Sequence, residues 1–273
     1  MSSHKLRPIN WPSGIKALVF DIEAMSFKFN PGMGEILCVA FQSPKWKEPR
    51  AVSYDDFEGY RDYHIQDRDF LLCQWMAEHF QDVETFIAHY GHGFDRPFIT
   101  ARMMYHGLGP FVQSIDEDTH RLAKRNFNPG KRGWGEGLPC SLRNLCEFLG
   151  VEHQKTGMSK LEWRQLMTND YPDVMRDCAE YCKQDVRATL DVFNILKTLP
   201  GTRINWSLAE SGKIGIVCPN CGSDNVQRRG TRTTTVSEYR RYKCMQPKCG
   251  KWSRGTKNVW AINPKDDDIL VGV

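Results

Sequence analysis

Short apolar runs along the chain predict four β-strands, at residues 15–23, 35–42, 51–54 and 84–88. The first two flank Asn30-Pro31-Gly32, a strong turn sequence, so we expect them to form a hairpin. Apolar residues recur every three to four positions in four longer segments, which predicts helices at 68–80, 95–106, 141–149 and 173–197. Strands followed by a mixture of helices and strands predict an α/β fold with a mixed sheet flanked by helices.

The chain divides near Leu199-Pro200-Gly201, which ends the last of these helices. Residues 1–200 hold 24 Lys and Arg against 27 Asp and Glu, a net charge of −3. Residues 201–273 hold 13 against 6, a net charge of +7. We therefore predict two domains, 1–200 and 201–273. A small basic module is typical of a polyanion-binding appendage, although an ordinary solvated surface could carry the same charge.

Neither a membrane span nor an export signal is predicted. No run approaches 18 apolar residues, and the first fourteen residues lack an apolar stretch. We therefore expect a cytoplasmic protein without a membrane partner, in a bacterium or a phage-infected cell. In a reducing compartment, its ten cysteines are better explained as metal ligands or free thiols than as disulfides.

Four acidic residues and a tyrosine stand on the predicted strands and helices. Asp21 and Glu23 lie two positions apart on the first strand, so both side chains point to one face. Asp95 opens a helix, and Tyr181 and Asp185 lie one helical turn apart. Taken singly, each has a simpler explanation: surface acids on a strand, a first-turn helix acid, and a tyrosine beside a surface acid. Paired carboxylates repel each other, however, and a divalent cation removes that repulsion.

In this order, the patterns D-x-E, F-D and Y-x-x-x-D resemble the DEDDy branch of the DnaQ-like 3′–5′ exonucleases, which have a ribonuclease H-like fold. The resemblance extends over about residues 15–198. Residues 115–122 are similar to the segment between the second and third motifs of that family, and 94–99 to the exonuclease domains of family B polymerases. Tyr90 departs from the pattern, because many members have asparagine there.

The resemblance implies a hydrolase that removes nucleoside 5′-monophosphates from a 3′ end. It places two Mg²⁺ or Mn²⁺ ions on the four acidic residues, and it assigns to the tyrosine the orientation of the attacking water: Asp21, Glu23, Asp95 and Asp185, with Tyr181. Two such ions about 3.5–4 Å apart activate water and stabilise the leaving oxygen. The polymerase-like second motif favours DNA, in replication or repair, and a polymerase partner because no polymerase domain fits in the remaining residues.

Four cysteines have the spacing of a structural zinc site. Cys218 and Cys221 form a C-x-x-C-G turn, and Cys244 and Cys249 form a C-x₄-C-G turn. Two such turns place four thiolates at the corners of a tetrahedron, which suits one Zn²⁺. The segment from Asn225 to Lys243 has the composition of a β-hairpin, so we predict a small zinc-ribbon module. The other six cysteines lack this spacing, and we expect most of them in the core.

Two groups of basic and aromatic residues are candidates for nucleic-acid binding. Lys124–Phe127 and the segment after it suggest a basic, glycine-rich loop with Lys131, Arg132 and Trp134, although a plain surface loop would have the same composition. In the ribbon, cations interleaved with aromatics suit phosphate contacts and base stacking: Arg228, Arg229, Arg240, Arg241 and Trp252. The ribbon could instead bind a protein partner.

The leading hypothesis is a 3′–5′ exonuclease acting on single-stranded or frayed DNA, with the ribbon helping to hold the strand. An exoribonuclease of the same fold is the nearest alternative. A non-catalytic nucleic-acid-binding adaptor and a structure-specific endonuclease are the others. Digestion of matched DNA and RNA strands and of circular single strands separates these four.

Overall fold

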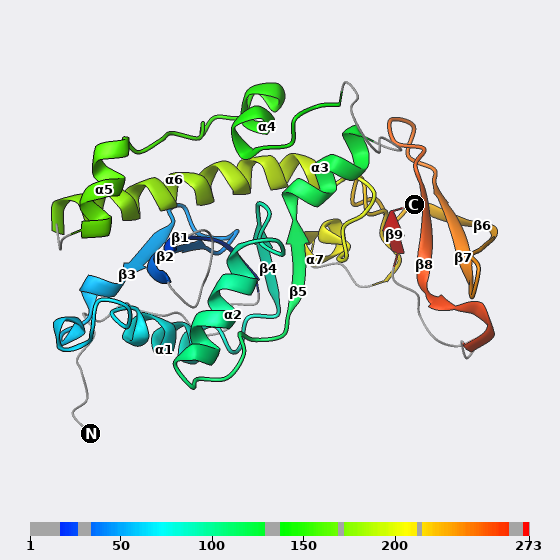
Figure 1. Cartoon of the computed structure of the whole chain (residues 1–273). Helices are drawn as coiled ribbons and strands as arrows, with labels where there is room; N and C mark the ends of the chain where they lie inside the picture. Colours follow the sequence, from blue (N-terminus) through cyan, green and yellow to red (C-terminus); the bar gives the residue numbers. More distant parts are fainter. Residues whose placement is uncertain are drawn as a thin grey trace. The chain divides into compact units, whose positions relative to one another are not determined.

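The computed structural model describes residues 17–26, 34–128, 137–168, 172–211, 215–261 and 270–272. The chain divides into two compact units, residues 1–120 with 139–193 and residues 121–138 with 194–273 (Figure 1). The division predicted at residue 200 stays a prediction.

The first unit contains a five-stranded mixed sheet. Its order is β3-β2-β1-β4-β5, with the bounds Ala17–Ser26 for β1, Gly34–Gln42 for β2, Arg50–Ser53 for β3, Thr85–Ala88 for β4 and Ile115–Asp118 for β5. β1 pairs antiparallel with β2, and β2 with β3, which confirms the predicted hairpin and third strand. β1 and β4, and β4 and β5, are parallel, and the pairing of Val19 with Ile87 places the end of β4 beside the middle of β1, close to Asp21.

Helices cover both faces of this sheet. Figure 1 shows α6 (Pro172–Leu196) along one face, and α1 (Phe70–His79) and α2 (Asp95–Tyr105) along the other. The core consists of apolar side chains of β1, β2 and β4 against these helices, including Phe20, Phe41, Trp75, Phe80 and Phe86. Burying such rings stabilises the fold by roughly 1.5–3 kcal/mol each.

The remaining helices are shorter. They are α3 (Thr119–Phe127), α4 (Leu142–Leu149), α5 (Lys160–Thr168), α7 (Trp206–Ser211) and three 3₁₀ turns at Tyr54–Asp56, Tyr60–Asp62 and Val259–Ala261. Ser141 caps α4 by accepting a hydrogen bond from the Asn144 amide at 3.4 Å, as its position predicts. None of the described helices is both long enough and apolar enough to cross a bilayer.

The prediction of a loop at Lys124–Phe127 is wrong, because these residues form the end of α3. The helix has a buried side, because Thr119, Leu122 and Ala123 stand at i, i+3 and i+4 and are all buried. β5 was not predicted as a strand either. Its residues, Ile-Asp-Glu-Asp, are mostly acidic, and only pairing with β4 makes this segment extended.

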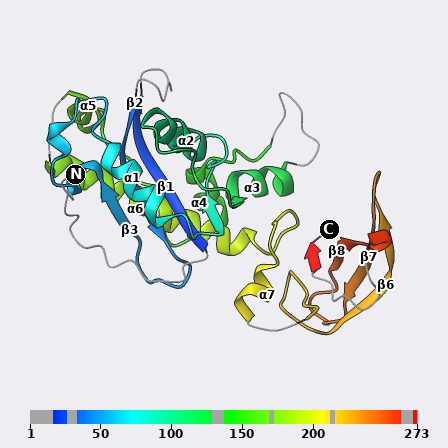
Figure 2. The same cartoon turned by 90° about the horizontal axis from the view of Figure 1, so that it is seen from below.

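The second unit contains an antiparallel sheet in the order β6-β7-β8-β9, visible in Figure 2. Its strands are β6 (Val226–Thr233), β7 (Glu238–Cys244), β8 (Trp252–Asn258) and β9 (Leu270–Gly272). β6 and β7 form the predicted hairpin. Few described side chains are fully buried in this sheet, chiefly Tyr242, Ser253 and Leu270, so its hydrophobic core is small.

Candidate active site

Three elements of the first unit, β1, α2 and α6, bring acidic side chains together beside the central strand of the sheet. Asp21 and Glu23 lie on β1, and Asp95 is the first residue of α2. The amide of Ile22, between the two strand acids, donates a hydrogen bond to Asp95 Oδ1 at 3.1 Å. Asp21 and Glu23 also lie with Cys182 of α6 in a group whose ligand atoms are within 4.8 Å of one another.

The fourth acidic residue, Asp185, comes from α6. Its side chain is buried and hydrogen-bonded by Tyr181, one turn earlier on the same helix. The ammonium of Lys155 forms an ion pair with Asp185 Oδ2 and also lies over the Tyr181 ring, 5.2 Å from its centroid. The five residues predicted from the sequence as catalytic therefore converge, although they span more than 160 positions of the chain.

Crowding of the carboxyl groups makes their ionised forms unfavourable. Burial, together with the charges of Asp95, Glu23 and Asp185, raises the pKa of Asp21 well above its usual value. Burial and the charge of Asp185 raise the pKa of Glu23 to about 8, and burial raises that of Asp95 to about 7. Burial also raises the pKa of Asp185, although the Lys155 ammonium opposes this effect.

These residues fit a site for divalent metal ions. Oδ1 of Asp185 is buried and accepts no hydrogen bond from the described part of the chain. Four carboxylates and one ammonium carry a formal charge of −3, which hard cations with oxygen ligands would neutralise. Burying like charges without partners is costly, and metal coordination is the usual compensation in proteins. The donor set is therefore suited to Mg²⁺ or Mn²⁺.

Lys155 is a residue of this site that the sequence analysis missed. It lies between α4 and α5, in a segment fixed by two contacts: His153 Nδ1 with Asp191 Oδ2 at 2.9 Å, and the Arg143 guanidinium with the Thr156 carbonyl at 3.2 Å. The neighbouring carboxylate raises the pKa of Lys155 despite its partial burial, so the side chain stays cationic. A single lysine in a polar segment carries no local pattern that could have identified it.

The turn between β4 and α2 is conformationally strained. Tyr90, at the position that departs from the family pattern, has a φ of 67°, the one positive value among the described non-glycine residues. Asp118 at the end of β5 stabilises this turn, because its carboxylate accepts the Tyr90 amide at 3.3 Å and contacts His92 Nδ1 at 2.5 Å. Gly91 leaves room here, since a Cβ at this position would lie 2.5 Å from Ala88 Cβ and 3.8 Å from Asp95 Oδ2.

The two histidines of this turn have different environments. Burial lowers the pKa of His89 to about 4, and its ring contacts Thr119 Oγ1 at 2.9 Å, so His89 is a neutral, structural residue. The side chain of His92 is partly exposed beside Asp118. Neither ring is hydrogen-bonded to Asp21, Glu23, Asp95 or Asp185 in the contacts of the described residues.

The six cysteines outside the zinc spacing are all buried, as expected: Cys38, Cys73, Cys140, Cys146, Cys178 and Cys182. Cys182 lies closest to the acidic residues, with its thiol 3.4 Å from the Asp21 carbonyl. Burial raises the pKa of Cys182 well above its usual value, so the thiol is protonated and packs as an apolar group.

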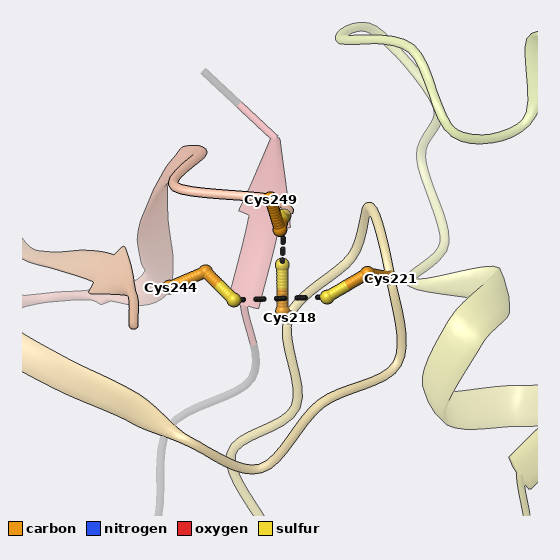
Figure 3. Close-up of side chains that lie close together, drawn as sticks. All are labelled: Cys218, Cys221, Cys244 and Cys249. Carbon is orange, nitrogen blue, oxygen red and sulfur yellow. Dashed lines mark hydrogen bonds between the residues drawn. The ribbon is translucent and has the colours of Figure 1, made fainter. Parts of the chain in front are cut away.

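The second unit holds the cysteine cluster, in which the four predicted residues meet. Figure 3 shows the side chains of Cys218, Cys221, Cys244 and Cys249 converging from two turns. Sγ of Cys218 is 3.8 Å from that of Cys249, and Sγ of Cys221 is 3.6 Å from that of Cys244. A tetrahedron of sulfurs at the Zn–S distance of about 2.3 Å has edges of about 3.8 Å. The cluster therefore fits one tetrahedral zinc ion.

The surroundings of the cluster act in opposite directions on the pKa values of its thiols. Burial opposes ionisation of Cys249, but hydrogen bonds from the Lys251 amide and from neighbouring groups outweigh it and lower the pKa of Cys249 to about 7. Asn220 Nδ2 contributes one of these bonds at 3.3 Å. Burial raises the pKa of Cys218 to about 12, so this thiol would release its proton only when a metal binds.

Of the predicted nucleic-acid contacts, Lys131, Arg132 and Trp134 lie outside the described residues. Arg228 and Arg229 lie exposed on β6, Arg240 and Arg241 on β7, and Trp252 begins β8. The structure brings Arg241 and Trp252 together, with the guanidinium 3.8 Å from the centroid of the ring. Arg240 alternates with Arg241 along the strand and therefore points to the opposite face.

A family model of the RNase H superfamily matches residues 18–197, and the chain belongs to this superfamily. This membership agrees with the mixed sheet and supports a nuclease function. No curated protein matches the sequence.

Solved structures with a similar fold include Escherichia coli exonuclease I in complex with a dT13 oligonucleotide, at 14% identity and a TM-score of 0.43. That alignment covers 68% of this chain and 41% of exonuclease I, so the chain spans less than half of that protein's length. Brucella melitensis NrnC aligns at 17% identity and a TM-score of 0.43, over 76% of this chain and 80% of NrnC.

Proposed function

We propose that the protein is a divalent-metal-dependent 3′–5′ exonuclease that releases nucleoside 5′-monophosphates. The observation that carries this proposal is the convergence of four carboxylates beside the central strand of an RNase H-like sheet: Asp21, Glu23, Asp95 and Asp185. Tyr181 and Lys155 lie beside them. A cluster of buried and half-buried carboxylates with raised pKa values has no stabilising function by itself, and such clusters are concentrated at functional sites.

The four carboxylates would hold two Mg²⁺ or Mn²⁺ ions, which supply an activated water and positive charge for the leaving 3′-oxygen. Tyr181 is suited to hold that water, because burial and the charge of Asp185 raise its pKa to about 12 and keep the phenol protonated. The phenol then orients the water by hydrogen bonding and does not act as a base. Lys155 keeps its positive charge beside Asp185 and can interact with a phosphate oxygen.

The proposed substrate is single-stranded or frayed DNA in the cytoplasm, with the 3′ end in the carboxylate site. The second unit would hold one structural zinc ion in its four cysteines, and its basic sheet would contribute to strand binding. The proposed preference for DNA rests on the resemblance of the second motif to polymerase exonuclease domains. The proposal of a polymerase partner in replication or repair rests on the same resemblance.

Digestion of 5′-labelled DNA and RNA strands of matched sequence tests this function. With Mg²⁺ or Mn²⁺ we expect a ladder that shortens from the 3′ end, and Asp21→Asn and Asp185→Asn should each slow it by several orders of magnitude. Asp177→Asn is the matched control, because Asp177 is an exposed acid on the same helix as Asp185.

Each alternative has its own outcome in the same experiment. Faster digestion of RNA would identify an exoribonuclease, and cleavage of circular single strands an endonuclease. Retained binding without cleavage under any metal would contradict the proposal and identify a non-catalytic adaptor.

A further inference from the structure

One face of the second unit's sheet carries a row of alternating cations and aromatic rings, which we call the cation–aromatic ladder. It consists of Tyr239, Arg241 and Lys243 of β7 and Trp252 and Arg254 of β8. The Arg241 guanidinium lies 3.8 Å and the Lys243 ammonium 5.6 Å from the centroid of the Trp252 ring. The Arg254 guanidinium lies 4.2 Å from the centroid of the Tyr239 ring.

The register of the strands places these five residues on one side. Lys243 pairs with Trp252, and Arg241 with Arg254, so each pair shares a face. Two of the residues that alternate with them, Tyr242 and Ser253, are buried. The ladder is therefore the outward face, and Trp252 keeps 37% of its surface exposed.

The ladder ends at a hollow of about 270 Å³ within the same unit. Trp252 forms one side of it, and the two cysteine turns contribute Asn220 and Lys251. Lys197 and Pro200, from the chain after α6, contribute another side. None of the described residues that line the hollow is acidic, so two lysines set its charge.

We propose that the ladder and this hollow form a binding site for single-stranded nucleic acid. Phosphates lie along Arg241, Lys243 and Arg254, and one base enters the hollow and stacks on Trp252. This inference deepens the proposed function and rests on it for the role of the bound strand.

Two features favour a nucleic-acid strand over an acidic peptide. First, a guanidinium stacked on a ring covers one face of each group and leaves the opposite faces for stacking with bases, and base–aromatic stacking is sequence-tolerant. Second, an acidic peptide would use the cations but has no planar group for an apolar-walled hollow beside a tryptophan. Charge alone would serve either ligand, because residues 215–261 contain ten Lys and Arg against two acidic residues.

The test measures binding of fluorescent dT15 by the full-length Asp185→Asn protein without added Mg²⁺, at several salt concentrations. Trp252→Leu should weaken binding about tenfold or more, and Trp252→Phe should restore most of it. Arg241→Gln should reduce the slope of log Kd against log salt by about 0.7, the contribution of one phosphate on a single strand. Lys257→Gln is the matched control, because Lys257 of β8 alternates with Trp252 and Arg254, points to the opposite face and should change Kd less than twofold.

An abasic strand of equal length separates stacking from charge. The abasic strand should bind the Asp185→Asn protein about as weakly as dT15 binds the protein that also carries Trp252→Leu. Adding Trp252→Leu should not weaken binding of the abasic strand further. Zinc content of one ion per chain in every variant excludes unfolding as the cause.

Equal binding of dT15 and the abasic strand would overturn the inference. The inference would also fail if Trp252→Leu lost affinity for polyglutamate to the same extent as for dT15. If the wild type cleaves no strand but binding still depends on Trp252, the proposed function fails and the strand-binding site stands. If cleavage is normal and Kd is unaffected by Trp252→Leu, the strand-binding site fails alone.

Discussion

The carboxylate site of the first unit and the cysteine cluster of the second are both sets of four anionic ligands, but they relate differently to the fold. The cysteines lie within 32 residues of one another, whereas the acidic residues extend from position 21 to 185. The carboxylates lie on and beside the central strand of a sheet with a large aromatic core. The cysteines stand beside a sheet with few buried side chains. We therefore predict that the first unit folds without metal ions and that the second needs a zinc ion to fold.

The largest effect is expected from removal of one zinc ligand. Cys244→Ser should abolish zinc binding and unfold the second unit, because a structural zinc contributes on the order of 10 kcal/mol, comparable with the whole stability of a small domain. The first unit should stay folded. Zinc analysis and limited proteolysis followed by mass spectrometry measure both effects. Cys146→Ala, at a buried thiol of α4, should keep its zinc; a full zinc complement in Cys244→Ser would contradict the contrast between the two sites.

Lys155→Met should lower kcat by about 10²-fold with intact folding, because a cation close to the reacting phosphate acts mainly in the transition state. Single-turnover rates at saturating substrate measure this loss. Lys160→Met, in the first turn of α5, is the control and should be near wild type. A rate unaffected by Lys155→Met would restrict this lysine to partial neutralisation of Asp185.

Gly91→Ala should destabilise the first unit by about 1–3 kcal/mol, since the new methyl group would overlap Ala88 and displace the turn that leads to Asp95. Urea denaturation gives the free energy of unfolding, and activity should fall in parallel. The matched control is Gly157→Ala, whose Cβ would meet only the Arg143 guanidinium at 3.8 Å. Equal stability of the two variants would show that the turn adjusts freely.

The smallest effect concerns pH. The folded-state pKa of Glu23 is about 8, above the usual value, so between about pH 4.5 and 8 the folded state binds more protons than the unfolded state. Without Mg²⁺, wild-type stability should therefore fall as pH rises from 6 to 8. Glu23→Gln lacks this titration, and its stability advantage should grow by about 1 kcal/mol between pH 7 and 8. Thermal melts with and without Mg²⁺ measure the stability difference between Glu23→Gln and the wild type. With Mg²⁺ the wild type should become the more stable of the two. A stability advantage of Glu23→Gln that does not change with pH would contradict the titration of Glu23 as its cause.

The sequence by itself determined which segments are strands and helices where an apolar face repeats, as in β1, β2, α1 and α6. It also determined the meeting of the four cysteines, because short turns bring together residues that are close in the chain. The acidic residues could be grouped only through a motif order shared with a family, since no local spacing relates Asp21 to Asp185.

Tertiary structure alone decided the features that depend on distant partners. β5 is extended because β4 pairs with it, despite an acidic sequence. Lys155 reaches Asp185 because His153 and Arg143 fix an otherwise unremarkable segment. The cation–aromatic ladder arises from the register of β7 with β8, which places Arg241 against Trp252 and leaves Arg240 on the other face. Strand register and long-range ion pairs are set by packing between elements, and a residue's own neighbours in the sequence do not encode them.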